Sequence, residues 1–176
     1  SVQSIISNPD ADPHLFTTSP DISKSLEEAQ IIIYNGANYD PWMDQMLKSL
    51  KNESVLVINV ADLMKLKYGN NPHIWYRPDT FPALANKLAD MIVLINQQSA
   101  KNVNSNLFNF LNQNKPVQDK IKMLNKQYNG VTVTATEPVF GYMADAIGLK
   151  MEGLDFQWKI MNDTEPTPKM IASYEE

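Results

Sequence analysis

Two histidines in matching loops are the residues of this sequence best suited to chemistry. They are the only histidines in the chain, and each follows a proline: Asp12-Pro13-His14 and Asn71-Pro72-His73. A preceding proline stiffens the loop and helps to aim the imidazole. Neutral imidazole is a common ligand of divalent transition metals. His14 and His73 are therefore candidate metal ligands, and the plainer alternative is that each is a surface residue or a hydrogen-bond partner.

Glu137 is the candidate carboxylate ligand. It lies just beyond the carboxyl end of a strand expected at residues 131–135 and directly before Pro138. Two imidazoles and one carboxylate form a ligand set that suits Mn, Fe or Zn. The alternative is that the negative charge of Glu137 only stabilises the start of the next helix. Spacing alone does not select Glu137 from the 20 acidic residues.

The order of the expected elements indicates an α/β fold. Strands are expected at residues 2–6, 30–34, 54–60, 131–135 and 149–152. Helices are expected at residues 20–29, 41–50, 104–128, 138–147 and 170–176, and from Pro82 onward, with a kink or an interruption at Pro116. The unbroken apolar runs within residues 30–34 and 54–60 are typical of strands buried on both faces of a parallel sheet.

This alternation predicts a parallel sheet flanked by helices, in which ligands bind at the carboxyl ends of the strands. His14 and Glu137 each follow an expected strand, and His73 lies in a loop further downstream of one. The predicted positions therefore agree with a site at one edge of the sheet.

Composition excludes several other functions. The chain has no cysteine, which removes disulfides, thiolate metal sites and cysteine nucleophiles. The net charge is -5 and no basic patch stands out, which argues against a nucleic-acid partner. No apolar run is long enough to span a membrane. Neither a glycine-rich phosphate loop nor a serine in a nucleophile elbow is present.

Five segments carry a resemblance to a known family. They are NPDADPHLF at residues 8–16 followed by Ser19 and Pro20, IYNGAN at 33–38, NPHIW at 71–75, TEPVFGY at 136–142 and EPTP at 165–168. In this order they resemble the metal-binding solute-binding proteins of bacterial ABC transporters. This zinc and manganese group includes lipoproteins similar to the pneumococcal surface adhesin, and the resemblance covers nearly the whole chain.

The resemblance implies capture of Mn²⁺ or Zn²⁺ outside the cytoplasm and delivery to an ABC permease for import. His14, His73 and Glu137 would be the first, second and third ligands, with the metal as cargo and no organic cofactor. The protein would act at the extracellular face of the membrane, held by a lipid anchor that this chain lacks, or in the periplasm. It would not be an enzyme.

The resemblance also implies a division of the chain. Residues 1–103 would form the N-terminal lobe, residues 104–128 a linking helix, and residues 129–176 the start of a C-terminal α/β lobe. The family's first strand would precede Ser1, and an aspartate that completes the site would follow Glu176. The chain departs from the family pattern at Arg77, where many relatives have an acidic residue, and between Asn59 and Asn70, where it lacks the His/Asp-rich insertion of many zinc-specific relatives. Glu137 also occupies the third-histidine position of classical zinc importers. An oxygen ligand there shifts the preference toward Mn or Fe.

Two alternatives stay open from the residues alone. A His-His-Glu set also occurs in metal-dependent hydrolases, although no general base is recognisable beside these ligands. An adhesin-type interaction protein with a structural metal is the other alternative. Turnover of an ester would identify the hydrolase, and loss of folding without metal would identify the structural site.

Overall fold

A computed structural model describes residues 1–14 and 16–175 of the chain. The chain divides into two compact units, Ser1–Pro72 and His73–Glu176, and each is described by itself. The boundary falls at the peptide bond between Pro72 and His73, directly before one of the predicted ligands.

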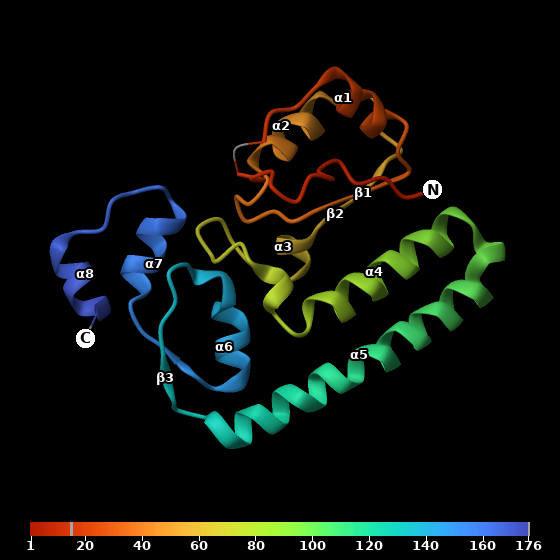
Figure 1. Cartoon of the computed structure of the whole chain (residues 1–176). Helices are drawn as coiled ribbons and strands as arrows, with labels where there is room; N and C mark the ends of the chain where they lie inside the picture. The colour runs from red at the N-terminus through yellow and green to blue at the C-terminus, as the bar shows by residue number, and fades with distance from the viewer. Residues whose placement is uncertain (15, 176) are drawn as a thin grey trace. The chain divides into compact units, whose positions relative to one another are not determined.

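The first unit is a parallel pair of strands packed against two helices (Figure 1). Its elements are α1 (Pro20–Glu27), β1 (Ile31–Tyr34), α2 (Pro41–Ser49), β2 (Leu56–Asn59) and the short α3 (Val60–Leu63). Ile32 of β1 pairs with Val57 of β2, which sets the parallel register. Leu26 from α1, Ile32 from β1 and Met43 from α2 form the buried core, so both helices are held to the strands by apolar contact.

The two central strands are confirmed as a parallel pair, but the prediction that they are buried on both faces is wrong. Ile32 and Ile58 are 4% and 3% exposed, whereas their chain neighbours Ile33 and Val57 are 43% and 37% exposed. The sheet of this unit has two strands among the described residues, so each strand has a single neighbour. A strand in a two-stranded sheet is packed less completely by neighbouring elements than a central strand of a wide sheet, so one of its faces stays partly exposed.

The strand predicted at residues 2–6 is also wrong. These residues form no strand, and the side chain of Val2 is fully exposed. Ile5 nevertheless packs against the core formed by α1, β1 and α2. A segment with apolar residues becomes a strand only where another strand offers hydrogen bonds, and Ile5 packs against the core without such pairing.

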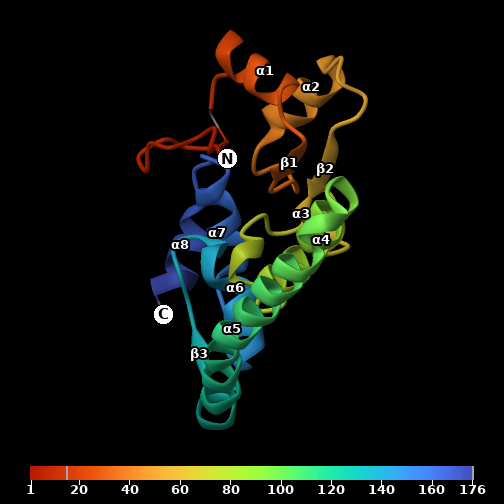
Figure 2. The same cartoon turned by 90° about the vertical axis from the view of Figure 1, so that its right-hand side faces the viewer.

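The second unit begins with an antiparallel helical hairpin, visible as α4 and α5 side by side in Figures 1 and 2. Its elements are the 3₁₀ turn η1 (Ile74–Tyr76), α4 (Thr80–Ile95), the 3₁₀ turn η2 (Gln97–Ser99) and α5 (Ala100–Tyr128). The long helix predicted at 104–128 is confirmed and begins four residues earlier. It is not interrupted at Pro116, because a proline removes one backbone hydrogen bond and the turns on either side retain theirs.

The remaining part of the second unit is a small βαβ arrangement followed by two helices. Its elements are β3 (Thr132–Val133), η3 (Pro138–Phe140), α6 (Gly141–Ile147), β4 (Lys150–Met151), α7 (Leu154–Met161) and α8 (Pro168–Glu175). β3 and β4 are parallel, as expected, but each is only two residues long. Gly148 ends α6 in the left-handed conformation, with φ of 81°. The sequence did not predict α7, and residue 176 of the last predicted helix lies outside the described residues.

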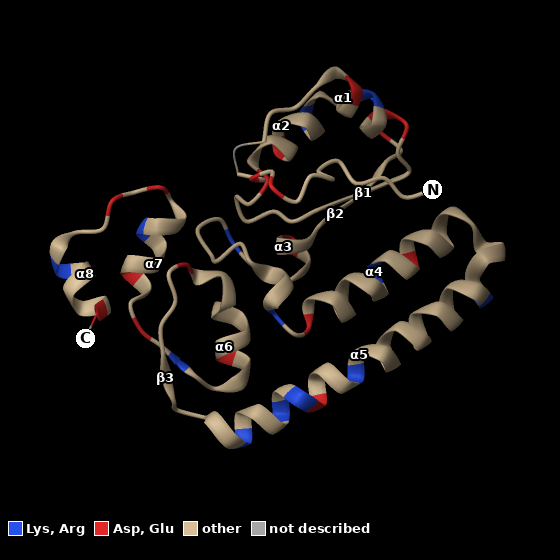
Figure 3. Ribbon diagram, in the orientation of Figure 1, with Lys and Arg blue, Asp and Glu red and all other residues tan. Residues whose placement is uncertain are grey.

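The observed elements confirm the α/β class with small parallel sheets flanked by helices. The division into lobes at 1–103, 104–128 and 129–176 stays a prediction. None of the helices in the described part combines the length and apolar character needed to cross a bilayer. Basic residues gather along the second half of α5 (Figure 3), where Lys122 lies 3.9 Å from Asp119 and both side chains are solvent-exposed.

Candidate metal centre

The loop that carries His14 is held by three hydrogen bonds. The backbone N–H of His14 donates to Asp12 Oδ1 at 2.8 Å, and the indole Nε1 of Trp42 donates to the carbonyl of Pro13 at 3.1 Å. The imidazole Nδ1 of His14 lies 3.2 Å from the carbonyl oxygen of Asn38. A carbonyl only accepts, so this contact requires a proton on Nδ1 and leaves the lone pair of the neutral ring on Nε2. This arrangement fixes the tautomer and orientation in the way found for metal-ligating histidines.

The carbonyl of Asn38 is presented by an unusual turn after β1. Gly36, Ala37 and Asn38 all have positive φ, at 76°, 51° and 65°. Ala37 in this region is strained, because a Cβ disfavours left-handed backbone. Gly36 is required for space as well, since a Cβ there would collide with the side chain of Asn59. Tyr39 closes the turn by donating its N–H to the carbonyl of Gly36 at 3.0 Å.

Asp40 holds this turn from inside. Its carboxylate accepts the N–H of Asn35 at 2.7 Å and the N–H of Gly36 at 2.8 Å, and the residue is only 9% exposed. Desolvation by burial raises the pKa of the Asp40 carboxyl above its ordinary value, although the two amides act in the opposite direction. The pKa of Tyr39, whose ring meets His14 edge-on at 4.8 Å, is also raised by burial and then by the charges of Asp12 and Asp40. The surroundings of His14 are therefore acidic, which favours a cation.

His73 is buried, at 5% exposure, where the second unit begins. It precedes η1, and its ring meets Trp75 edge-on at 5.2 Å. The turn is anchored to α4 because the buried hydroxyl of Thr80 donates to the carbonyl of Ile74 at 2.7 Å. Tyr76 of the same turn contacts Phe140 ring to ring at 5.6 Å, which ties η1 to the segment after Glu137.

Glu137 is exposed and precedes η3 in extended conformation, with φ of -136° and ψ of 158°. Its side chain makes no capping hydrogen bond to η3, and the alternative that its charge stabilises the start of the next helix stays untested. Pro138, the next residue, is buried. The backbone at the start of η3 is therefore anchored, while the Glu137 carboxylate makes no hydrogen bond to the turn that follows it.

The three predicted ligands are divided between the two units. His14 belongs to Ser1–Pro72, whereas His73 and Glu137 belong to His73–Glu176. In the second unit, the elements that follow His73 and Glu137 pack together through η1 and α6. Among residues 1–14 and 16–175, no three His, Asp or Glu side chains are gathered closely enough to hold one ion. The trio of His14, His73 and Glu137 stays a prediction.

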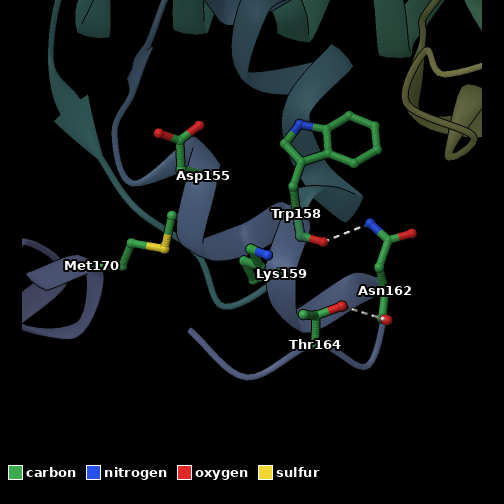
Figure 4. A pocket seen from close by; sticks show the side chains of 6 residues that line it. All are labelled: Asp155, Trp158, Lys159, Asn162, Thr164 and Met170. Carbon is green, nitrogen blue, oxygen red and sulfur yellow. Dashed lines mark hydrogen bonds between the residues drawn. The ribbon is translucent and has the colours of Figure 1, made fainter. Parts of the chain in front are cut away.

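A hollow of the second unit lies elsewhere, between α7 and α8 (Figure 4), with a volume of about 410 Å³. Its walls are Asp155, Trp158, Lys159, Asn162, Thr164 and Met170. Two of its polar groups are already used locally: Asn162 Nδ2 donates to the Trp158 carbonyl at 2.6 Å, and Thr164 Oγ1 donates to the Asn162 carbonyl at 3.0 Å. None of the predicted ligands lines this hollow, and a single carboxylate does not make a metal site.

Sequence reasoning missed the residues that support the histidine loops. Asn35, Asp40 and Trp42 were assigned no role at the site, and Gln157 was not singled out. Gln157 is fully buried, its Nε2 donates to the carbonyl of Glu152 at 2.8 Å, and its Oε1 has no partner in the described part of the chain. The bonds from Trp42 to Pro13 and from Asn35 to Pro72 span 29 and 37 residues, and no local pattern reveals them. The bonds of Asp40 and Gln157 lie within five residues, but no motif marks them.

Curated proteins named for metal binding or for metal transport resemble the chain over most of its length. A Thermotoga maritima protein, described as a putative metal-binding protein, is 29% identical over 152 residues, covering 81% of this chain and 52% of its own length. The manganese ABC transporter substrate-binding lipoprotein PsaA of Streptococcus mitis is 26% identical, over 94% of this chain and 57% of its own. The zinc-binding protein AdcA of Streptococcus pyogenes is 22% identical, over 92% and 36%. The chain thus spans about half the length of these relatives, or less.

Solved structures share the fold at lower identity. The metal-dependent lipoprotein YcdH from Bacillus subtilis superposes with a TM-score of 0.72 at 19% identity, over 80% of this chain and 54% of its own. The Zn(II)-bound ZnuA-like domain of Streptococcus pneumoniae AdcA gives 0.70 at 19% identity, over 81% and 54%. The fold is therefore of the class seen in metal-binding substrate-binding proteins.

The family follows from the sequence itself. The model of the family ZnuA, described as zinc-uptake complex component A, periplasmic, matches residues 1–176. The chain belongs to this family. The resemblance expected from the five sequence segments is confirmed.

Proposed function

We propose that this protein captures a divalent transition metal outside the cytoplasm and delivers it to the permease of an ABC transporter. Family membership over residues 1–176 supports the proposal, as do relatives named for zinc binding and for manganese transport. The metal is cargo, so the protein makes and breaks no covalent bond. Catalysis is no part of the proposal, because members of the family are substrate-binding transport proteins.

The observation that carries the proposal is the tautomer and orientation of the His14 imidazole, which its hydrogen bond fixes. Its Nδ1 is committed to the carbonyl of Asn38, so its Nε2 presents a lone pair without any rearrangement. A ligand already held in this way binds faster and with a smaller entropic cost than a freely rotating one. His73 and Glu137 are the proposed second and third ligands, and they leave a coordination position for a further group.

The proposed ion is Mn²⁺ or Zn²⁺. Glu137 contributes a hard oxygen donor, which favours Mn²⁺ relative to an all-histidine set, while Zn²⁺ binds any such site more tightly in absolute terms. The proposed location is either the extracellular face of the membrane, where a lipid anchor would hold the protein, or the periplasm. The partner is the cognate permease, which the names of the relatives imply.

Calorimetric titration of the metal-free protein with Mn²⁺ and with Zn²⁺ tests the proposal. The wild type should bind one ion, and His73→Ala should weaken binding at least about 100-fold, which is roughly 2.7 kcal/mol. Glu137→Gln keeps the shape of the side chain and removes its charge, so it should also weaken binding. Glu53→Gln, at an exposed glutamate in the first unit, makes the same charge change and should leave the affinity unaltered.

Two results would contradict the proposal. If His73→Ala retains the wild-type affinity, the ligand assignment is wrong. If the metal-loaded protein hydrolyses a phosphoester or carboxylic ester, the hydrolase alternative replaces transport.

A further inference from the structure

Both proline residues that precede the histidines are bonded to one short segment, residues 35–42. Trp42 Nε1 donates to the carbonyl of Pro13 at 3.1 Å, and Asn35 Nδ2 donates to the carbonyl of Pro72 at 2.8 Å. Proline has no N–H, so its carbonyl is the only backbone group through which such a loop can be tied at that residue. Each bond therefore fixes the peptide unit that leads directly into His14 or His73.

The same segment also fixes one imidazole directly. The carbonyl of Asn38 accepts from Nδ1 of His14, and this carbonyl is aimed by three successive residues with positive φ. Backbone in this region costs free energy and persists only where surrounding contacts hold it. The aim of the His14 ring thus depends on whatever stabilises residues 36–38.

Asp40 is the residue that stabilises them. Its two carboxylate oxygens accept the amides of Asn35 and Gly36, the two residues that directly follow β1. Asn35, whose backbone is bonded to Asp40, uses its side chain for the Pro72 carbonyl, and Trp42 stands two residues after Asp40 at the start of α2. The bonds to the Pro13 carbonyl, to the Pro72 carbonyl and to the His14 ring therefore all depend on Asp40.

We infer that residues 35–42 form a single bracket that positions both histidines, with Asp40 as its lock. Asp40 is a positioning residue: its carboxylate bonds backbone amides and not an imidazole. The bracket holds the two X-Pro-His loops, which lie far apart in the sequence. Its effect on metal capture rests on the proposed function, whereas its effect on the two imidazoles does not.

Imidazole two-bond ¹H–¹⁵N correlation spectra of the metal-free protein test the bracket. The chain has only two histidines, so His14→Ala and His73→Ala assign every signal. Trp42→Phe removes the bond to Pro13 and should shift the signals of His14 alone. Asn35→Ala removes the bond to Pro72 and should shift those of His73 most. Asp40→Asn should shift both sets and weaken the Nδ1–H tautomer of His14.

Matched controls separate positioning from general loss of structure. Asp44→Asn removes a nearby carboxylate, in α2, that accepts the hydroxyl of Tyr34 at 3.1 Å. Asn52→Ala removes an asparagine side chain that donates to the backbone carbonyls of Glu27 and Ala29. It matches Asn35→Ala, because the side chain of Asn35 also donates to two backbone carbonyls. Both controls should lower stability without moving either histidine. If Asp40→Asn does not fold, the double variant Asn35→Ala/Trp42→Phe, which removes both attachments and keeps Asp40, should shift both sets of signals.

Metal titration of the same variants supplies the second readout. Asp40→Asn should weaken Mn²⁺ and Zn²⁺ binding by about 10- to 100-fold, as loss of a residue that supports a ligand does, while Asp44→Asn should not. The bracket is overturned if Asp40→Asn leaves the signals of either histidine unchanged, or if the controls move both. Failure of the wild type to bind metal, with the expected spectral pattern intact, would overturn the proposed function and leave the bracket supported.

Discussion

The loop that carries His14 and the loop that carries Glu137 are held in different ways. His14 is fixed at its backbone, at its ring and at the preceding carbonyl, by Asp12, Asn38 and Trp42. Glu137 is exposed and its side chain makes no capping bond in the turn that it begins. One candidate ligand is therefore oriented before a metal arrives, and the other retains its rotamer freedom.

This difference has a consequence for affinity. An oriented imidazole has already lost the conformational entropy that binding would otherwise cost, whereas a mobile glutamate must lose it on binding. The imidazole should contribute more net affinity, and the carboxylate should be the ligand that leaves first. Under the proposed function, release needs at least one weakly held ligand, and Glu137 is the candidate for it.

The largest expected effect is a loss of metal affinity, and it should differ between the two candidate ligands His14 and Glu137. His14→Ala should weaken Mn²⁺ binding at least about 100-fold, or roughly 2.7 kcal/mol, and Glu137→Ala about tenfold, or roughly 1.4 kcal/mol. Calorimetric titration at one pH measures both. Equal losses would show that orientation before binding gives His14 no advantage.

The second expected effect concerns the turn that orients His14. Gly36→Ala should destabilise the protein by about 2–3 kcal/mol, because the new Cβ meets both a positive φ and the side chain of Asn59. Gly69→Ala is the matched control, since Gly69 has φ of 87° and nothing within 4 Å of an added Cβ. It should cost about 1 kcal/mol from backbone strain alone. Urea denaturation measures the two, and a control as damaging as Gly36→Ala would exclude the steric contribution.

The third expected effect concerns the support of His73. Thr80→Val removes the buried hydroxyl that donates to the Ile74 carbonyl and leaves that carbonyl without this donor, at a cost of about 1–2 kcal/mol. Thr134→Val removes an exposed hydroxyl that donates to the Glu152 carbonyl at 3.2 Å, where water can replace it, and should cost less than about 0.5 kcal/mol. Thermal denaturation distinguishes them. Similar losses would mean that η1 does not depend on Thr80.

The smallest expected effect is a pH dependence from Asp40. Because the folded-state pKa of Asp40 is raised above its ordinary 3.8, its contribution to stability is fully present below pH 3.8 and is lost as pH rises through the folded-state pKa. An asparagine side chain does not titrate, so the melting temperature of Asp40→Asn minus that of the wild type should increase with pH over this interval and then level off. Parallel melting curves across the acid range measure this difference. A difference that decreases with pH would contradict the raised pKa.

Much of the fold was predictable because its signals are local. The β-branched run before Asn35, the proline that begins α2 and the glycine that ends α6 each act within a few residues, and all three assignments are confirmed. The wrong predictions concern which other part of the chain packs against or pairs with a segment. Residues 2–6 read as a strand but have no strand to pair with in the described part of the chain, and Ile33 reads as buried but is 43% exposed.

The candidate site divides in the same way. The sequence alone determined which side chains are candidate ligands, because two X-Pro-His loops and a glutamate after a strand define donors without reference to their neighbours. It also determined the family, through short motifs in a fixed order. Only the tertiary structure decided how the histidine loops are held. The bonds from Asn38, Trp42 and Asn35 span 24, 29 and 37 residues, and a hydrogen bond between groups so far apart exists only once the chain has folded.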